Sequence, residues 1–533
     1  MKKIIQVKKK LTKKSLIVGL NAFGFNTSTT LIKNGKPIFS IEEERVIREK
    51  RTRKFPIAGI RQALKYTGHS IQDLEAVAIS WNPAINLELL SSNNSERLRY
   101  IPEAFYSVPS YLINMKKNKN TLLTKQKIEF MDGIDLEIYY LNHHICHASS
   151  YYLSPFNKAA VLTVDAFGEK QSSSFSIGNS NEITCIWSQE FPHSLGSFYS
   201  TFTQYCGFSP QSDEWKLMGA APYGNSKSKY YKRVRSLVEL NDQGFLLKLE
   251  FFNHYQFHRP NYYSRKMIDK IGIEPNTKDK KLTKEYYNLA AAAQRVFEEI
   301  YFHLLNLLYK KTKLKNLVIA GGSALNSVAN GKVLANTPFK KIFVPPVPDD
   351  SGGSMGAAHY LYHHLMGYER NYEMKNNYLG PSFDDSYIEK LLKKYSIKYR
   401  KLKSPEKNAA KMIADGKIVA WFQGRLEYGD RALGNRSILA DPRDEKMKDK
   451  INSSIKYREP FRPFAPAVLI EKAKYYFENH LPTPFMEKVY KVKKDVQKKI
   501  PAVTHVDGSG RIQTVDRKQN PLFYSLIEEF EKI

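Results

Sequence analysis

Three segments of the chain share one pattern of hydrophobic and polar positions, an apolar, mostly β-branched run that ends in small or polar residues. They are residues 16–21 with the polar run 26–30 behind them, residues 160–165 leading to Gly168, and residues 317–322 leading to Asn326. Buried strands that open onto turns and then helices are typical of α/β domains that bind ligands at their strand ends. The pattern predicts an α/β fold with these segments as strands and a phosphate or nucleotide cradle among the turns.

The order of the three segments resembles the two-lobed domain of actin and the sugar kinases. In that architecture two such turns hold phosphate and a third holds adenosine. The resemblance implies one actin-like domain over residues 15–370. A single strand with a Gly-Gly turn would more simply indicate ordinary strand–helix packing, so the prediction depends on all three segments together.

A second domain is predicted beyond a polar stretch that contains Gly380-Pro381 and is expected to form a linker over residues 371–383. The apolar spacing that follows predicts a helix around 388–392, a strand at 397–400, a helix at 405–414 and a strand at 418–422. This alternation predicts a smaller α/β domain over residues 384–533.

Composition supports a folded chain of several domains. The 533 residues are 42% hydrophobic and 26% charged, values that exclude wholesale disorder, collagen and coiled coil. The three cysteines form no CxxC pair, which argues against a disulfide framework and a cysteine-built zinc site and favours a reducing cytoplasm. No run approaches the roughly 18 to 20 apolar residues of a membrane span, so we expect a soluble cytoplasmic protein with no membrane partner.

The formal net charge of +30 arises from 83 Lys+Arg against 53 Asp+Glu. Most of the excess is lysine spread along the chain in pairs, which we interpret as a solvated surface. Residues 1–14 are the exception, because they carry seven lysines and predict a disordered basic tail for an anionic partner. A nucleic-acid partner ranks third among the hypotheses and is not expected.

The sharpest chemical signal is the segment Asn142 to Ala148, which reads NHHICHA. In a helix, His143 and His147 lie one turn apart on one face and can bind one metal ion. Asp165 at the end of the next strand and Asp350 before a predicted helix supply carboxylates. Two imidazoles and two carboxylates suit Fe(II), Mn(II) or Zn(II). If the histidine motif stood alone, two incidental surface histidines would be the favoured interpretation.

A second cluster is rich in arginine and lies in residues 424–437 and 456–464. Guanidinium groups interleaved with glycine and asparagine suit bidentate binding of phosphate or carboxylate oxygens. The segment 505–511 adds a hydroxyl and a guanidinium. A small polyanion fits this cluster better than a nucleic-acid strand, and arginines paired to surface carboxylates are the alternative.

Further motifs lie at residues 20–23 (LNAF), 42–45 (EEER), 216–219 (KLMG), 221–224 (APYG), 320–326 (AGGSALN) and 504–508 (THVDG). With the histidine and arginine motifs they cover nearly the whole chain in order. This set resembles the NodU-type O-carbamoyltransferases of nodulation-factor and antibiotic biosynthesis. The resemblance implies that a YrdC-like second domain forms carbamoyladenylate from carbamoyl phosphate and ATP. It also implies that the first domain, similar to the metal-dependent proteins of tRNA threonylcarbamoyladenosine synthesis, transfers the carbamoyl group to a hydroxyl of a small-molecule or sugar acceptor.

The resemblance also implies roles for single residues. Fe(II), or alternatively Mn(II) or Zn(II), would be held by His143, His147, Asp165 and Asp350. Nucleotide and carbamoyl phosphate would contact Gly321, Gly322, Asn326, Arg425, Arg431, Arg436, Arg458, Arg462 and Ser509. The expected catalytic residues are Asn26, Lys216 and Arg436.

The sequence departs from the family pattern at several positions. The family has histidine before Asp or Asn in the first turn, where it would assist deprotonation of the acceptor hydroxyl, and this chain has Phe25-Asn26. The family pattern continues beyond Ile533 with another strand, so we expect a C-terminally incomplete second domain, and Asp430 stands where proline is common. The alternative function is a catalytically degraded relative that binds nucleotide, metal or a partner. The acceptor, the metal and a homodimeric state stay open.

Overall fold

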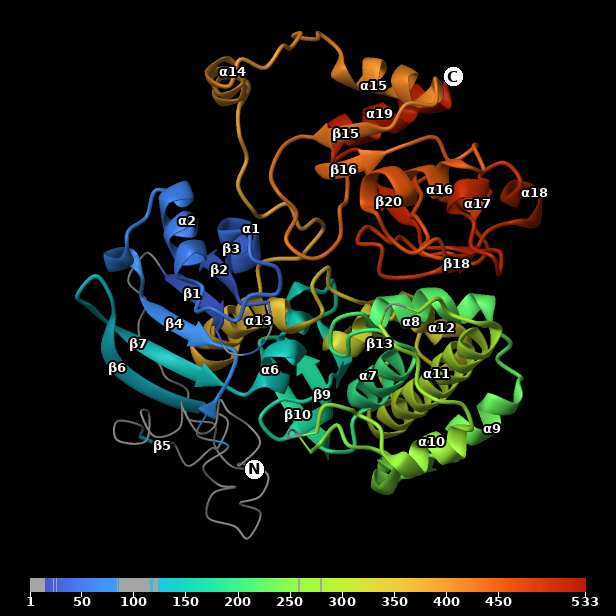
Figure 1. Ribbon diagram of the computed structural model, residues 1–533. Coiled ribbons are helices and arrows are strands. Elements are labelled where there is room, and N and C mark those ends of the chain that lie inside the picture. Colours follow the sequence, from blue (N-terminus) through green and yellow to red (C-terminus); the bar gives the residue numbers. More distant parts are fainter. Residues whose placement is uncertain are drawn as a thin grey trace. The chain divides into compact units, whose positions relative to one another are not determined.

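The computed structural model describes residues 15–533 except 23, 25, 84, 86–115, 118–122, 257–258 and 279. The chain divides into two compact units, Met1–Met374 and Lys375–Ile533, and each is described by itself (Figure 1). The division falls within residues 371–383. The predicted basic tail at residues 1–14 and the departure at Phe25 lie outside the described residues.

The first sheet of unit 1 comprises seven strands, β1 (Leu16–Asn21), β2 (Ser28–Lys33), β3 (Lys36–Glu42), β4 (Ala76–Ile79), β5 (Lys116–Lys117), β6 (Leu123–Met131) and β7 (Ile134–Leu141). Their order in the sheet is β3-β2-β1-β4-β7-β6-β5. β2 and β3 follow β1 as an antiparallel meander, whereas β4 and β7 run parallel to β1 on its other side. β1 is buried along its whole length, as its continuous apolar run predicts.

The second sheet comprises five strands, β8 (Lys158–Val164), β9 (Gln171–Asn179), β10 (Glu182–Glu190), β13 (Asn316–Ala320) and β14 (Lys341–Phe343). Their order is β10-β9-β8-β13-β14. β9 and β10 form the antiparallel side, and β13 and β14 run parallel to β8. The arrangement found around β1 in the first sheet therefore recurs around β8. This repetition confirms the predicted actin-like, two-lobed α/β architecture.

Two helices lie between the sheets, α6 (His143–Ala148) and α13 (Gly353–His359), the latter continued by a π-helical turn at Tyr360–Leu365. Both contribute to one apolar core that also includes Ile17 of β1 and Val161 of β8. A side chain at Gly356 would place its Cβ 1.9 Å from the Cys146 carbonyl oxygen, so only glycine permits this approach of α13 to α6. The close packing fixes the ends of both helices relative to the two sheets.

Some of the remaining described helices of unit 1 pack directly on the sheets, and others pack on the longest helix of the unit (Figure 1). The longest helix, α11 (Lys284–Thr312), buries an apolar stripe that includes Leu289, Val296 and Leu304, about one residue per two turns. These helices are α1 (Glu43–Ile47), α2 (Ile57–Thr67), α7 (Leu195–Tyr205), α8 (Glu214–Ala220), α9 (Lys229–Arg235), α10 (Arg265–Ile271), α11 (Lys284–Thr312) and α12 (Ser327–Asn336), beside the hairpin β11 (Val238–Asn241) and β12 (Gly244–Leu247).

Unit 2 is a smaller α/β unit of short strand pairs and short helices. Its strands are β15 (Val419–Phe422), β16 (Arg436–Leu439), β17 (Ala467–Leu469), β18 (Tyr490–Lys491), β19 (Ser509–Gly510) and β20 (Gln513–Val515). Its helices are α14 (Asp385–Lys394), α15 (Pro405–Ala414), α16 (Met447–Ile451), α17 (Ala473–Tyr476), α18 (Lys494–Gln497) and α19 (Pro521–Glu531). α15 and α19 pack on the strands through a core that contains Trp421 and Phe523.

The prediction of a strand at residues 397–400 is wrong. The segment between α14 and α15 has no helix or strand, and its apolar side chains are exposed, Ile397 to 52% and Tyr399 to 42%. A strand needs a pairing partner or a core to cover one face, and this segment has neither, so its alternation of apolar residues does not lead to a strand.

No helix in the described part of the chain has the length and apolar character that crossing a membrane requires.

Candidate functional site

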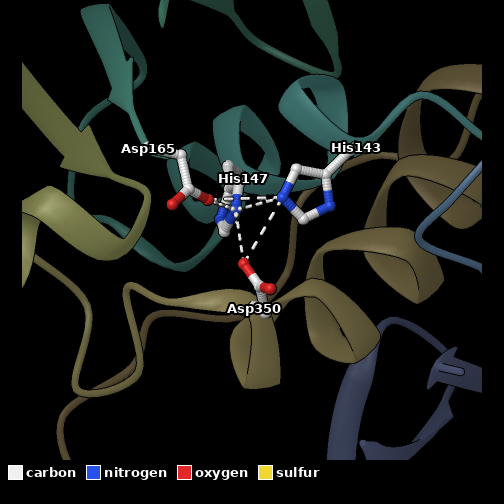
Figure 2. Close-up of side chains that lie close together, drawn as sticks. All are labelled: His143, His147, Asp165 and Asp350. Atoms are coloured by element: carbon white, nitrogen blue, oxygen red, sulfur yellow. Dashed lines mark hydrogen bonds and ion pairs between the residues drawn. The ribbon is translucent and has the colours of Figure 1, made fainter. Parts of the chain in front are cut away.

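Four side chains that are distant in the sequence gather at one point of unit 1 (Figure 2). His143 and His147 come from α6, Asp165 follows β8, and Asp350 begins a short 3-10 turn in front of α13. His147 Nε2 lies 3.0 Å from His143 Nε2 and 2.9 Å from Asp165 Oδ2. The potential ligand atoms of the four residues all lie within 4.8 Å of one another. The structure therefore brings together the four residues that the sequence predicts as metal ligands.

Ordinary local structure places these groups. The Asn142 side chain accepts a hydrogen bond from the backbone N–H of Ile145 at 3.0 Å and so caps the start of α6. His147 follows His143 by one helical turn and points to the same side (Figure 2). Asp165 stands at the carboxyl end of β8, where an α/β sheet presents its ligand-binding groups.

The spacing of the donor atoms fits one divalent metal ion. With metal–ligand bonds of about 2.1 Å, two ligand atoms lie about 3.0 Å apart at a right angle and about 3.4 Å apart at the tetrahedral angle. His143 Nε2 lies 3.3 Å from Asp165 Oδ2 and 3.4 Å from Asp350 Oδ1, and His147 Nε2 lies 3.6 Å from Asp350 Oδ1. The Asp350 side chain is 30% exposed and both histidines are 2% exposed, so Asp350 forms the open side of the cluster.

The electrostatics of the cluster favour a cation at its centre. Burial opposes protonation of His143, but its hydrogen bonds with Asp165 and Asp350 raise its pKa well above the ordinary value. Burial likewise opposes ionisation of Asp165, and the two histidines nevertheless hold its pKa well below the ordinary value. The carboxylates thus attract positive charge to the space between the imidazoles. A bound metal ion would take the place of that proton.

The groups around the cluster fix which nitrogen of His143 can bind a metal. The Ser80 carbonyl oxygen lies 3.3 Å from His143 Nδ1 and accepts its hydrogen, which leaves the Nε2 lone pair directed at the centre. The neighbouring His144 does not belong to the cluster. Its Nε2 donates to the Gln171 carbonyl at 3.0 Å and its Nδ1 accepts from the Thr163 hydroxyl at 2.7 Å, while burial lowers its pKa to about 3.

Glu169 is a part of the site that the sequence patterns do not indicate. It is 5% exposed, and its carboxylate accepts hydrogen bonds from Asn82, Asn142 and His143. Burial raises the pKa of Glu169, and His143 and these hydrogen bonds act against that rise. Its place four residues after Asp165 is the only sequence signal of its role.

Of the three predicted catalytic residues, Asn26 lies beside the cluster. It sits in the β1–β2 turn, where its carbonyl oxygen accepts hydrogen bonds from Asn21 Nδ2 at 3.2 Å and from the Ser351 hydroxyl at 3.3 Å. Ser351 follows Asp350 directly, and a Cβ at Gly24 in the same turn would lie 3.6 Å from Asp350 Oδ2. The side-chain oxygen of Asn26 is buried without a hydrogen-bond partner among the described residues.

Lys216, the second predicted catalytic residue, lies on α8. Its Nζ is 3.2 Å from Asp213 Oδ2, and it stands over the rings of Trp215 and Phe208 at 5.2 and 5.7 Å. These contacts orient the ammonium group next to a carboxylate and two aromatic rings. Its catalytic role stays a prediction.

The loop expected to contact adenosine follows β13. A Cβ at Gly322 would lie 2.9 Å from Asp165 Oδ1, and Gly321 packs against Val164, so this loop borders the metal cluster. Asn326 is engaged inside the protein, because it caps α12 by accepting from Ala329 N–H at 3.0 Å and exchanges two hydrogen bonds with Gln294. The adenosine contact predicted for its side chain stays a prediction.

In unit 2, three arginines crowd together. Burial and the positive charges of Arg431 and Arg458 lower the pKa of Arg511 well below its usual value. Among the described residues, neither Arg431 nor Arg511 forms a hydrogen bond or a salt bridge, although the Asp430 carboxylate acts on Arg511 electrostatically, and Arg458 donates to Asn452 Oδ1 at 2.6 Å. Like charges held this close favour binding of an anion, and guanidinium groups bind phosphate and carboxylate oxygens alike. Arg511 was not among the residues predicted to bind nucleotide, although it lies in the 505–511 motif.

The other predicted arginines have partners inside unit 2. Arg436 donates to the carbonyl oxygens of Gln423, Asn435, Pro381 and Gly424, and its guanidinium lies 3.6 Å from the Phe422 ring centroid. Arg425 donates to the carbonyls of Leu379 and Gly380, and Arg462 pairs with Glu459 at 3.7 Å. Arg436 and Arg425 therefore organise the loops of this unit, and their contact with phosphate stays a prediction.

Ser509 belongs to a hydrogen-bonded group of three side chains, with Asp507 and His505. Its hydroxyl donates to Asp507 Oδ1 at 2.6 Å and lies 3.0 Å from His505 Nδ1, which must then donate its hydrogen to Ser509. This fixes the lone pair of His505 on Nε2, an atom that is buried without a partner among the described residues. Arg511 follows Ser509 by two residues on the same segment, so this hydrogen-bonded group lies next to the arginine cluster.

Comparison with known proteins identifies the family. The model described as carbamoyltransferase N-terminus matches residues 16–359, and the model described as carbamoyltransferase C-terminus matches residues 410–533. The chain belongs to the carbamoyltransferase family. The two matches cover both units, confirm the predicted family and two-domain architecture, and make the chain a transferase.

The chain is similar to two relatives over most of its length and, more weakly, to one solved structure. The uncharacterized protein sll1178 of Synechocystis sp. is 36% identical over 97% of this chain and 89% of its own length. Nodulation protein NolNO of Sinorhizobium fredii is 34% identical over 96% of this chain and 73% of its own length. A crystal structure of full-length HypF in the phosphate- and nucleotide-bound form has 13% identity and a TM-score of 0.33 over 68% of this chain and 57% of that chain.

Proposed function

We propose that this carbamoyltransferase makes O-carbamates in two steps. In the first step carbamoyl phosphate and water give carbamate and phosphate, and carbamate with ATP gives carbamoyladenylate and pyrophosphate. In the second step the oxygen of an acceptor hydroxyl forms a bond to the carbamoyl carbon, the bond from that carbon to the AMP phosphate oxygen breaks, and AMP and the hydroxyl proton leave. Unit 2 carries out the first step and unit 1 the second.

The observation that carries the proposal is the donor set His143, His147, Asp165 and Asp350, with neighbouring atoms 2.9 to 3.6 Å apart. Imidazole and carboxylate ligands suit Fe(II), and also Mn(II) or Zn(II). When bound, such an ion supplies Lewis acidity toward the oxygen atoms of the adenylate. The partly exposed Asp350 marks the side from which the carbamoyl donor would approach.

The residues beside Asp350 would orient the acceptor. Asn26 Oδ1, which has no described partner, can accept the hydrogen bond of an acceptor hydroxyl. Asn26 cannot remove the proton, so its contribution is to hold the hydroxyl against the carbamoyl carbon. The similarity to carbamoyltransferases supports a small-molecule acceptor, of which a sugar hydroxyl is one example.

In unit 2, Arg431, Arg458 and Arg511 would bind the phosphates of ATP and carbamoyl phosphate. Adenylate formation brings the carbamate anion against the triphosphate of ATP, and fixed guanidinium groups are the residues that neutralise this negative charge. The lowered pKa of Arg511 reflects the burial and like charges that a polyanion would relieve.

Incubation of the protein with carbamoyl phosphate and ATP is the test of the first step. We expect carbamoyladenylate and pyrophosphate, detected by mass spectrometry, and no pyrophosphate when carbamoyl phosphate is omitted. ATP binding without either product would support the alternative, a relative that retains ligand binding but has lost turnover. Absence of both binding and products would contradict the role proposed for unit 2.

A further inference from the structure

We propose that Glu169 is a positioning residue of the metal centre. It fixes the position of His143 by joining the start of α6 to the end of β4. The inference rests on the proposed metal-binding function of the His143 cluster and adds to it a residue outside the four ligands. Nothing in the motif resemblance or in the family match assigns a role to Glu169.

The contacts of Glu169 come from two segments far from it in the sequence. Its Oε1 accepts from the backbone N–H of Asn82 at 2.7 Å and from that of His143 at 3.0 Å. Its Oε2 accepts from Asn142 Nδ2 at 3.0 Å and lies 3.2 Å from the His143 nitrogen. One carboxylate thus binds the residue that caps α6, the first residue of α6 and the segment after β4.

The same strand end also holds the imidazole of His143. The carbonyl of Ser80, directly after β4, accepts from His143 Nδ1, and the Trp81 and His143 rings pack in an edge-to-face arrangement with their centroids 5.5 Å apart. Ser80 therefore fixes the ring and Glu169 fixes the backbone of one metal ligand against one strand end. A shift of α6 relative to β4 would move His143 Nε2 relative to Asp165 and Asp350, which come from other elements.

The chemistry of the three donors requires a carboxylate. An ionised carboxylate is a pure acceptor with about four lone-pair sites, whereas a glutamine amide offers one oxygen and an NH₂ group that can only donate. A glutamine at this position would place that NH₂ against a donor, either Asn142 Nδ2 or a backbone N–H. Among the described residues no lysine or arginine is paired with Glu169, so its place in the interior is not explained by an ion pair.

The test compares metal affinity in Glu169→Gln with that of the wild type and of a matched control, Glu182→Gln. Glu182 is an exposed glutamate at the start of β10, and its replacement makes the same chemical change away from the site. Metal-depleted full-length protein is titrated with Mn(II), and free Mn(II) is measured by electron paramagnetic resonance. We expect Glu169→Gln to weaken binding by about 10- to 100-fold, the usual effect of removing a group that orients a metal ligand, and Glu182→Gln to bind as the wild type does.

A second variant separates positioning from general stability. Asn142→Ser keeps a side-chain oxygen that can cap α6 but removes the Nδ2 donor to Glu169, and we expect it to weaken Mn(II) binding by less than Glu169→Gln does. Thermal unfolding of the metal-free variants identifies any that do not fold. Unchanged Mn(II) affinity in folded Glu169→Gln and Asn142→Ser would overturn the inference while leaving the metal centre intact. Absence of binding in the wild type would overturn the proposed metal function itself.

Discussion

Replacing His147 by alanine is expected to reduce metal affinity by more than about 100-fold and carbamoyl transfer by at least as much. The basis is that loss of a group merely supporting a ligand already costs about 10- to 100-fold, and His147 is a ligand in this account. Its Nε2 lies 2.9 to 3.6 Å from the donor atoms of the other three residues. Metal content after dialysis and the rate of AMP release from carbamoyladenylate are the two measurements.

The matched control is His144→Gln, which alters a buried histidine of the same helix. His144 is held by Thr163 and Gln171, away from the cluster, so this variant is expected to lose stability but keep its metal. Equal loss of metal in both variants would show that α6 had been disturbed as a whole. Full metal content and activity in His147→Ala would contradict the assignment of the site.

Replacing Arg511 by alanine is expected to weaken binding of ATP or carbamoyl phosphate by roughly 10- to 150-fold. This range corresponds to the loss of one charge-assisted hydrogen bond, about 1.5 to 3 kcal/mol. Arg511 combines deep burial with proximity to Arg431 and Arg458, and the nearby Asp430 carboxylate opposes their effect on its pKa. Isothermal titration with each ligand measures the effect.

The control is Arg517→Ala, which removes the same charge from an exposed arginine that pairs with Glu528. We expect it to leave both affinities within about twofold of the wild type, since a solvated charge outside the cluster is screened by salt. Similar losses in Arg511→Ala and Arg517→Ala would indicate a nonspecific attraction between a basic protein and anionic ligands, and not a phosphate site.

Local sequence patterns were sufficient for the elements that surround the site. The predicted strand at residues 16–21 coincides with β1, the helix at 405–414 coincides with α15, and the NHHICHA segment forms α6. In each case an apolar run, a proline at the first helical turn or a capping residue determines the structure within a few residues. The strand expected at 397–400 failed because a strand depends on a partner that no local pattern supplies.

The parts of the site that the sequence did not reveal depend on distant contacts. Glu169 acquires its place from a hydrogen bond to Asn82, which is 87 residues away. Arg436 and Arg511 look alike in the sequence, yet Arg436 donates to backbone carbonyls while Arg511 lies against two other arginines. Sequence spacing can predict that two histidines lie on one helical face. It cannot show which buried charged side chain already has hydrogen-bond partners inside the protein.

The most direct test of the account supplies chemically made carbamoyladenylate and a panel of hydroxyl acceptors to the metal-depleted protein, with and without added metal. Mass spectrometry then follows AMP and carbamoylated acceptor, in the wild type and in His147→Ala. The account predicts that AMP release and at least one O-carbamate depend on added Fe(II), Mn(II) or Zn(II) and are lost in His147→Ala. Binding of carbamoyladenylate without any metal-dependent AMP release, or equal AMP release by the two proteins, would contradict it.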